Sequence, residues 1–163
     1  MIEQIFTIGG YGFTEPSFLR ALDQARVDLF CDVRQRRGMR GSSYAFLNAK
    51  RLQSLLSEAG IQYLHFKDFS PTSAIREAQK DEDAKLGILK RSRESLGSAF
   101  IAGYKSEVLA PKSQQAFFDR FPKNASRPCI FCVERKPAAC HRSLLADWLV
   151  AYGHVPISHL YPE

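Results

Sequence analysis

Reactive side chains concentrate in one stretch, CVERKPAACHR at residues 132–142, which holds two cysteines, a glutamate, a histidine and three cations. An apolar run typical of a buried strand precedes it, and a pattern typical of a helix follows it. Cys140 therefore falls at or just before the first helical turn, where the helix dipole and nearby cations lower the pKa of a thiol. This position predicts a nucleophile at Cys140. The alternative is a small residue that packs the turn.

Two neighbours of Cys140 are candidates for proton transfer or ligand binding. His141 follows it directly, and adjacent residues of a helix do not face each other, so we expect His141 to be a poor base for Cys140 and assign it to ligand binding. Glu134 ends the preceding strand. It is a candidate general acid or base, or else the partner of a buried arginine.

The spacing Cys129-x-x-Cys132, with Cys140-His141 further on, resembles a zinc-binding set. Zinc-binding Cys-x-x-Cys pairs lie on tight turns, whereas Cys129 and Cys132 flank Ile130-Phe131 in a predicted strand. Side chains at i and i+3 of a strand point to opposite faces, so these two thiols cannot bind one ion. We predict neither a metal nor a cofactor.

The same stretch can also hold an anion. A loop that leads into a helix presents free N–H groups to phosphate or carboxylate, and Arg142 in the first turn can pair with such a ligand. Gly9, Gly10 and Tyr11, which follow the first predicted strand, are assigned to the same ligand site. The alternative is that Pro137 merely shapes a turn.

A second polar stretch, DVRQRRGMRG at residues 32–41, follows the second predicted strand. Asp32 and Arg34 alternate onto one face at the strand end, and we assign both to the ligand site. A buried arginine needs a carboxylate, from Asp32 or Glu134. The rest of the loop mixes cations with the aromatic residues that follow, which suits nucleic-acid binding, with a solvated basic loop as the alternative. Its predicted nucleic-acid contacts are Arg36, Arg37 and Arg40.

Five apolar runs predict the strands that position these groups, at residues 3–9, 28–33, 61–66, 128–133 and 154–160. Helical patterns follow Thr14 and Asn48 and cover 142–152. We interpret residues 67–123 as a helical insert, interrupted at Gly87 and Gly97. Together they predict one α/β domain over residues 1–163, with a mostly parallel five-stranded sheet and helices on both faces.

Parallel strands bring their carboxyl ends to one edge, where ligands bind in open α/β sheets. The loops that leave this edge are polar and rich in glycine, so we predict the functional site there. His65 ends the third strand at this edge and is a candidate acid or base. A core histidine with satisfied hydrogen bonds is the alternative.

Composition restricts the partners. The chain has 163 residues, a net charge of +6 and a pI of 9.3, which favours an anionic partner such as phosphate, a nucleotide or nucleic acid. No apolar run approaches the length of a membrane span, and the N-terminus lacks the basic region of a signal peptide. We therefore expect a cytoplasmic protein whose four cysteines stay reduced.

The combination of TIGGYG, DLFCDVR, GIQYLHF, FCVERKPAACHR and LLADWL resembles the DUF488 family, a set of small conserved proteins of unassigned function. The resemblance covers nearly the whole chain in the right order. It implies an α/β domain, and its characteristic positions are Arg34, Glu134, Cys140, His141 and Arg142. The chain departs from the family where Gly10-Tyr11 replaces a common His-Ser and where QRRGMRG replaces a stretch with proline and serine.

These observations favour a protein that binds, and can process, a phosphate-bearing ligand, nucleotide or nucleic acid in a cleft at the strand ends. The main alternative is a non-catalytic nucleic-acid-binding or adaptor protein that uses the Arg34–Arg40 loop. A third is a redox-responsive module that uses Cys140.

Overall fold

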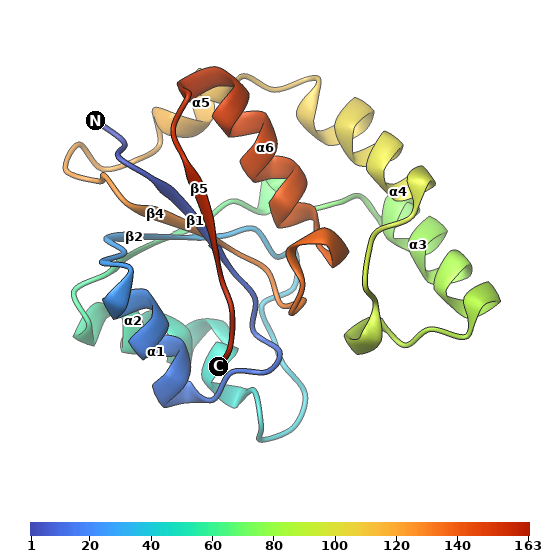
Figure 1. Ribbon diagram of the computed structural model, residues 1–163, viewed down its shortest axis with the longest axis horizontal. Coiled ribbons are helices and arrows are strands. Elements are labelled where there is room, and N and C mark those ends of the chain that lie inside the picture. Colours follow the sequence, from blue (N-terminus) through green and yellow to red (C-terminus); the bar gives the residue numbers. More distant parts are fainter.

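The computed structural model describes residues 1–163 except for the side chain of Arg91. Within that part of the chain, five parallel strands form one sheet in the order β3-β2-β4-β1-β5 (Figure 1). The strands are β1 (Ile5–Ile8), β2 (Leu29–Asp32), β3 (Gln62–His65), β4 (Pro128–Phe131) and β5 (Ile157–Leu160). The predicted α/β class and parallel sheet are therefore confirmed.

Helices cover both faces of the sheet, as predicted (Figure 1). Helices α1 (Glu15–Gln24) and α2 (Ala49–Glu58) lie on one face, and α5 (Gln114–Phe118) and α6 (His141–Gly153) lie on the other. Thr14 caps α1 as predicted, because its side chain accepts a hydrogen bond from the amide of Ser17. Asn48 stands at the N-cap of α2, but its side-chain oxygen accepts from the amide of Met39 instead.

Aromatic side chains fill the space between the sheet and the first two helices. The ring of Phe18 in α1 contacts the rings of Phe30 and Phe131 from the sheet, and also that of Phe46. Burying a side chain of this size contributes about 1.5–3 kcal/mol. This packing holds strands β2 and β4 rigidly in position. Several candidate site residues lie at the carboxyl ends of these two strands or just after them.

The predicted helical insert lies between β3 and β4. It contains α3 (Ser73–Leu86), α4 (Ser98–Gly103), a π-helical turn (Tyr104–Leu109) and α5. Helix α3 ends at Gly87, which adopts a left-handed φ of +67°, and Gly97 stands at the N-cap of α4. We call residues 87–97 the covering segment. No helix in the described part of the chain is long and apolar enough to cross a membrane.

The carboxyl end of β1 passes very close to the loop after β4. A Cβ atom at Gly9 would lie 2.0 Å from the carbonyl oxygen of Glu134, a distance that real side chains do not adopt. The amides of Gly10 and Tyr11 both donate to the carbonyl of Val133, at 2.9 and 3.0 Å. The backbone of Gly9–Tyr11 therefore packs against the loop after β4 and is hydrogen-bonded to it, at the edge where the site was predicted.

Candidate functional site

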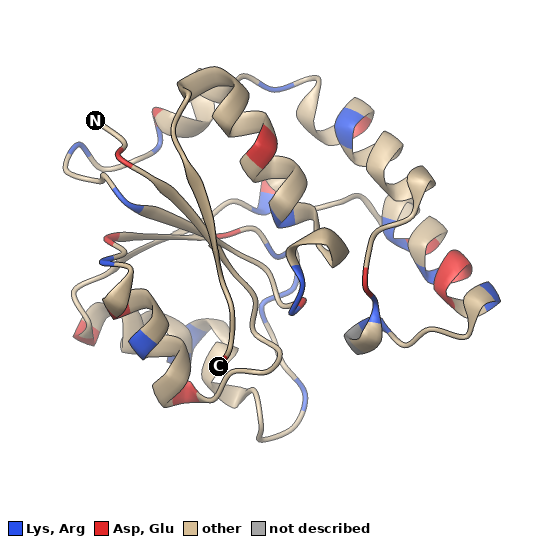
Figure 2. Ribbon diagram, in the orientation of Figure 1, with Lys and Arg blue, Asp and Glu red and all other residues tan. Residues whose placement is uncertain are grey.

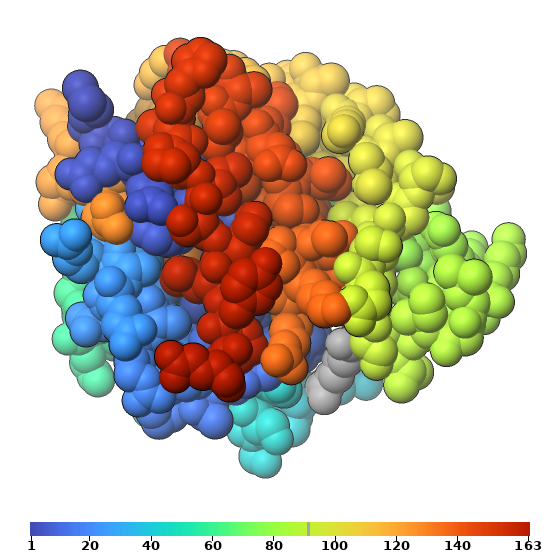
Figure 3. Space-filling model, in the orientation of Figure 1, coloured from blue at the N-terminus to red at the C-terminus, as the bar shows by residue number. Residues whose placement is uncertain are grey.

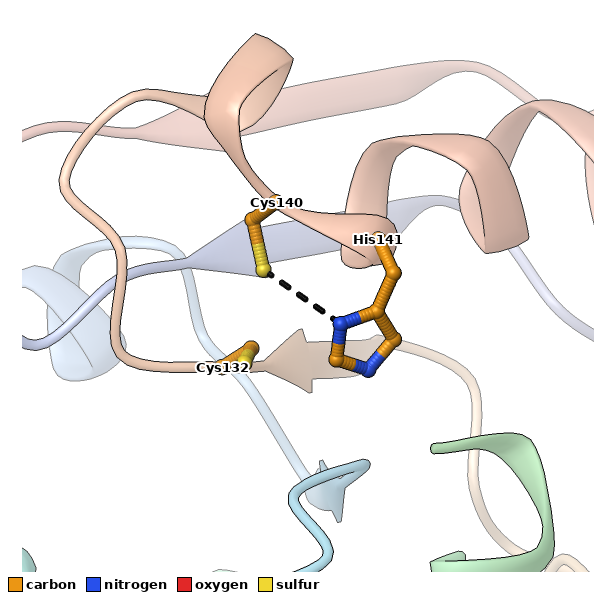
Figure 4. A group of neighbouring side chains, drawn as sticks. All are labelled: Cys132, Cys140 and His141. Carbon is orange, nitrogen blue, oxygen red and sulfur yellow. Dashed lines mark hydrogen bonds between the residues drawn. The ribbon is translucent and has the colours of Figure 1, made fainter. Parts of the chain in front are cut away.

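Cys140 and His141 form a side-chain pair at the start of α6 (Figure 4). The Sγ atom of Cys140 lies 3.8 Å from Nδ1 of His141, and both residues are buried. The expectation that the two would not face each other is wrong. The rule that adjacent residues of a helix do not face each other does not apply here. Cys140 is the N-cap, and its backbone is extended (φ −139°, ψ 145°) instead of helical.

The ring of His141 is held in place from two further directions. Its Nε2 lies 3.1 Å from the carbonyl oxygen of Val33, and because a carbonyl only accepts, Nε2 carries the proton. Its ring centroid lies 5.4 Å from that of Tyr104, which comes from the insert. These contacts direct Nδ1 toward the thiol.

A second thiol, that of Cys132, completes the cluster. Cys132 directly follows β4, and its Sγ, the Sγ of Cys140 and a ring nitrogen of His141 all lie within 4.8 Å of one another (Figure 4). The hydrogen bond with Cys140 and burial raise the pKa of Cys132 well above its ordinary value. The spacing of the two cysteines alone does not predict this proximity, because seven residues separate them, of which Pro137–Ala139 form a short 3₁₀ turn.

Cys140 differs from the other thiols in its electrostatic surroundings. Burial acts to raise its pKa, but the hydrogen bond with Cys132 and the positive charges of His141 and Arg142 outweigh it, so the pKa lies well below the ordinary value. No side chain among the described residues caps α6. The side chain of Cys140 itself, the N-cap residue, makes no hydrogen bond to the first-turn amides, although the partial positive charge of the helix N-terminus still favours a thiolate at this position. Burial instead raises the pKa of Cys31 and Cys129, which lie within strands.

Glu134 is buried at the start of the loop, and its carboxyl titrates near neutral pH. Burial raises its pKa to about 7, against the opposing effect of the Lys90 ammonium group, whose Nζ lies 3.5 Å from Oε1. A carboxyl group with this pKa can both donate and accept a proton at physiological pH. Lys90 comes from the covering segment, and the sequence did not point to it.

Replacing Glu134 with glutamine is expected to flatten the pH dependence of stability. Between the ordinary pKa of 4.5 and the folded value of about 7, the folded state keeps a proton that the unfolded state has lost. The free energy of unfolding should therefore fall as pH rises across this range, by about 3 kcal/mol at most, and stay level above it. Urea unfolding at several pH values measures this fall. The exposed control Glu107→Gln should retain it, and equal slopes in both variants would contradict the prediction.

Arg34 is paired with Asp32, one of the two carboxylates that the sequence offered. Its Nε and one Nη donate to the two carboxylate oxygens at 3.0 and 2.9 Å, and both side chains are buried. Tyr63 also donates to Asp32, at 2.7 Å. The other Nη of Arg34 is buried and has no hydrogen-bond partner among the described residues. Glu134, the alternative partner, pairs with Lys90 instead.

Arg142 is fully buried and holds the loop from inside. Its guanidinium donates to the carbonyl oxygens of Glu134 and Arg135 at 2.5 and 3.1 Å, and to Oγ1 of Thr7 at 3.4 Å. Each of its three nitrogens thus makes a contact within the chain. Its assignment to an anionic ligand stays a prediction, as does that of Asp32, Gly9, Gly10 and Tyr11.

His65 lies at the end of β3, as predicted, and its Nε2 donates to the carbonyl of Arg34 at 2.7 Å. This contact matches the alternative of a histidine with a satisfied hydrogen bond, and an acid or base role stays a prediction. In the loop after β2, Arg36 and Arg40 are exposed, whereas Arg37 donates to Tyr63 at 3.3 Å. Figure 2 shows basic and acidic residues interspersed over the fold, with both signs on α3.

The covering segment closes the site from the side of the insert. The amide of Leu96 donates to the carbonyl of Ala138 at 2.9 Å, and Glu94 forms an ion pair with Lys136. In Figure 3 the yellow residues of the insert accordingly lie against the orange residues of the loop. Cys140 keeps only 2% of its surface exposed.

Two hollows lie elsewhere on the molecule. One of about 930 Å³ lies between the starts of α1 and α2, and one of about 460 Å³ lies beside β5. Neither is lined by Cys132, Cys140 or His141. The predicted edge therefore carries Cys132, Cys140 and His141 in a closed, compact arrangement against the covering segment.

The cluster of Cys132, Cys140 and His141 offers three donor atoms, two sulfurs and an imidazole nitrogen. A structural zinc site uses four protein ligands, and a catalytic one uses three and a water. Among the described residues, Cys129 belongs to no such group, in agreement with the opposite faces that strand geometry predicts. The expected absence of a metal stays a prediction.

Comparison with known proteins gives a family but no activity. A family model described as a domain of unknown function, DUF488, matches residues 16–149. No curated protein and no solved structure matches the chain. The resemblance that the motifs suggested is confirmed over most of the sequence. The chain therefore belongs to the DUF488 family.

Proposed function

We propose that this DUF488 protein is a thiol-dependent enzyme in which Cys140 attacks a small electrophilic substrate. The observation that carries the proposal is the side-chain pair at the N-terminus of α6, where Sγ of Cys140 lies 3.8 Å from Nδ1 of His141. The thiolate is the nucleophilic form of cysteine, and a neighbouring histidine and a helix N-terminus both favour it.

The contacts suggest how protons move. His141 takes the proton of Cys140 on Nδ1, since its Nε2 already donates to the carbonyl of Val33. The resulting thiolate lies next to the uncapped N-terminus of α6, whose dipole stabilises negative charge. The proton held on His141 can then pass to a leaving group, and Glu134, with its pKa of about 7, is a second proton donor near neutral pH.

Alkylation of the thiols by iodoacetamide tests the proposal directly. We expect Cys140 to react at pH 7, with an apparent pKa below the ordinary value of about 8.5, and the Cys140→Ser variant to lose this reaction. Cys129→Ser is the matched control, because Cys129 is fully buried in β4, and it should leave the reaction unchanged. An apparent pKa of Cys140 at or above about 8.5 would contradict the proposal.

Binding of a phosphate-bearing ligand is a second candidate function. It is favoured by the buried, unpaired Nη of Arg34 and by Lys90, an exposed cation at the edge of the site. Inorganic phosphate or pyrophosphate should then raise the melting temperature of the protein and of Cys140→Ser equally. Arg34→Lys should remove the effect, and no shift in the parent protein would argue against this function.

The nucleic-acid-binding alternative rests on the exposed cations Arg36 and Arg40. It predicts salt-dependent binding of long DNA or RNA that is lost when both are changed to glutamine and kept in Cys140→Ser. Binding that ignores salt, or that survives the double substitution, would reject it.

A further inference from the structure

We infer that Cys132 and Cys140 act as a dithiol that reduces small hydroperoxides, with Cys140 as the attacking thiol and Cys132 as the resolving thiol. The inference rests on the proposed function of Cys140 and adds a substrate class and a second catalytic residue. It starts from the one place in the described chain where two buried thiols and an imidazole meet.

The geometry allows the two sulfur atoms to bond. They lie within 4.8 Å of each other, whereas a disulfide requires about 2.05 Å. Cys132 comes just after β4 and Cys140 just before α6. The gap can therefore close by movement of residues 133–139, which join the strand to the helix.

The two thiols differ in a way that assigns their roles. Cys140 contacts His141 and lies at the helix N-terminus, so it is the thiol that is activated for attack. Cys132 has burial and the neighbouring sulfur acting against its ionisation, so it stays protonated until Cys140 has reacted. An arrangement of one activated and one protonated thiol suits two consecutive steps.

The closed site favours a reactant of very few atoms. Cys140 is 2% exposed, and the hollows of about 930 and 460 Å³ do not reach it. Hydrogen peroxide is small and uncharged. A bulky disulfide or peptide substrate would instead require the covering segment to separate from the loop.

The chemistry balances with the groups present and a hydroperoxide. The thiolate of Cys140 attacks the terminal peroxide oxygen, the O–O bond breaks, and the departing alkoxide or hydroxide takes the proton held on His141. Cys140 is now a sulfenic acid. Cys132 then gives up its proton and attacks the sulfur of Cys140, the S–O bond breaks, and hydroxide leaves with that proton as water. The dithiol loses two electrons, the peroxide gains them, and an added thiol such as dithiothreitol reduces the disulfide again.

Mass spectrometry of the full-length protein after treatment with hydrogen peroxide tests the inference. The parent protein should lose two hydrogen atoms, and peptide mapping should link Cys132 to Cys140. Cys132→Ser should stop at a sulfenic acid on Cys140 that dimedone traps, and Cys140→Ser should give neither product. Cys129→Ser is the matched control and should still form the disulfide. Circular dichroism verifies folding, and Cys132→Ala serves as a second variant if Cys132→Ser is unfolded.

The outcomes separate this inference from the proposed function. If Cys140 is alkylated rapidly at pH 7 but peroxide yields no Cys132–Cys140 disulfide, the dithiol activity is rejected and the nucleophile stands. If Cys140 is unreactive toward both reagents, both fail. If the purified protein holds stoichiometric zinc that protects both thiols, the cluster is a metal site and the inference is overturned.

Discussion

Replacing Arg142 with alanine is expected to lower the free energy of unfolding by about 4 kcal/mol. The substitution removes three hydrogen bonds and leaves the carbonyls of Glu134 and Arg135 without their donor. It also leaves a cavity where a fully buried side chain stood. Urea unfolding followed by circular dichroism measures the loss.

Two variants make this prediction specific. Arg142→Lys keeps the charge but cannot reproduce the forked contacts, so its loss of stability should be intermediate. The exposed Arg135→Ala should change the free energy of unfolding by less than about 0.5 kcal/mol. If Arg142→Ala were as stable as Arg135→Ala, the guanidinium would not be holding the loop.

Replacing His141 with glutamine is expected to lower the alkylation rate of Cys140 at pH 7 by about tenfold or more. Glutamine can still donate to the carbonyl of Val33, but it cannot carry the positive charge that lowers the pKa of the thiol. Each unit by which that pKa rises reduces the thiolate fraction about tenfold at a pH below it. A stopped-flow measurement of alkylation against pH gives both rate and apparent pKa.

The shape of the pH profile separates electrostatics from misfolding. At high pH, where Cys140 is ionised in both proteins, the rates of His141→Gln and the parent should converge. His65→Gln is the matched control, because His65 also bonds to a backbone carbonyl, that of Arg34, and it should leave the profile unchanged. A His141→Gln profile that is slower by the same factor at every pH would point to altered access instead.

The sheet and the edge that carries the site were accessible to sequence reasoning. Buried parallel strands are short apolar runs, and their carboxyl ends must share an edge, so the positions of Asp32, His65 and Glu134 follow from pattern alone. The pairing of Arg34 with Asp32 was also within reach, because alternate residues of a strand share a face.

The contacts that give the site its chemistry were not accessible in this way. The approach of Cys132 to Cys140 depends on how an irregular loop turns back, and no periodicity describes such a loop. The rule for helical neighbours misplaced His141, because it does not apply to an extended N-cap. Lys90 reaches Glu134 from a segment far away in the sequence, which only the packed insert reveals.

Because the covering segment is weakly held, the cysteines differ in the motions of the chain that expose them to a reagent. It is held to the loop by the Leu96 amide and by ion pairs involving exposed lysines, which are weak constraints. Cys31 and Cys129, in the interior strands β2 and β4, are fully buried. A thiol reagent should therefore reach Cys140 through local openings that urea hardly affects, and Cys31 and Cys129 only when the whole sheet comes apart. One chain thus contains natural probes of both its local and its global stability.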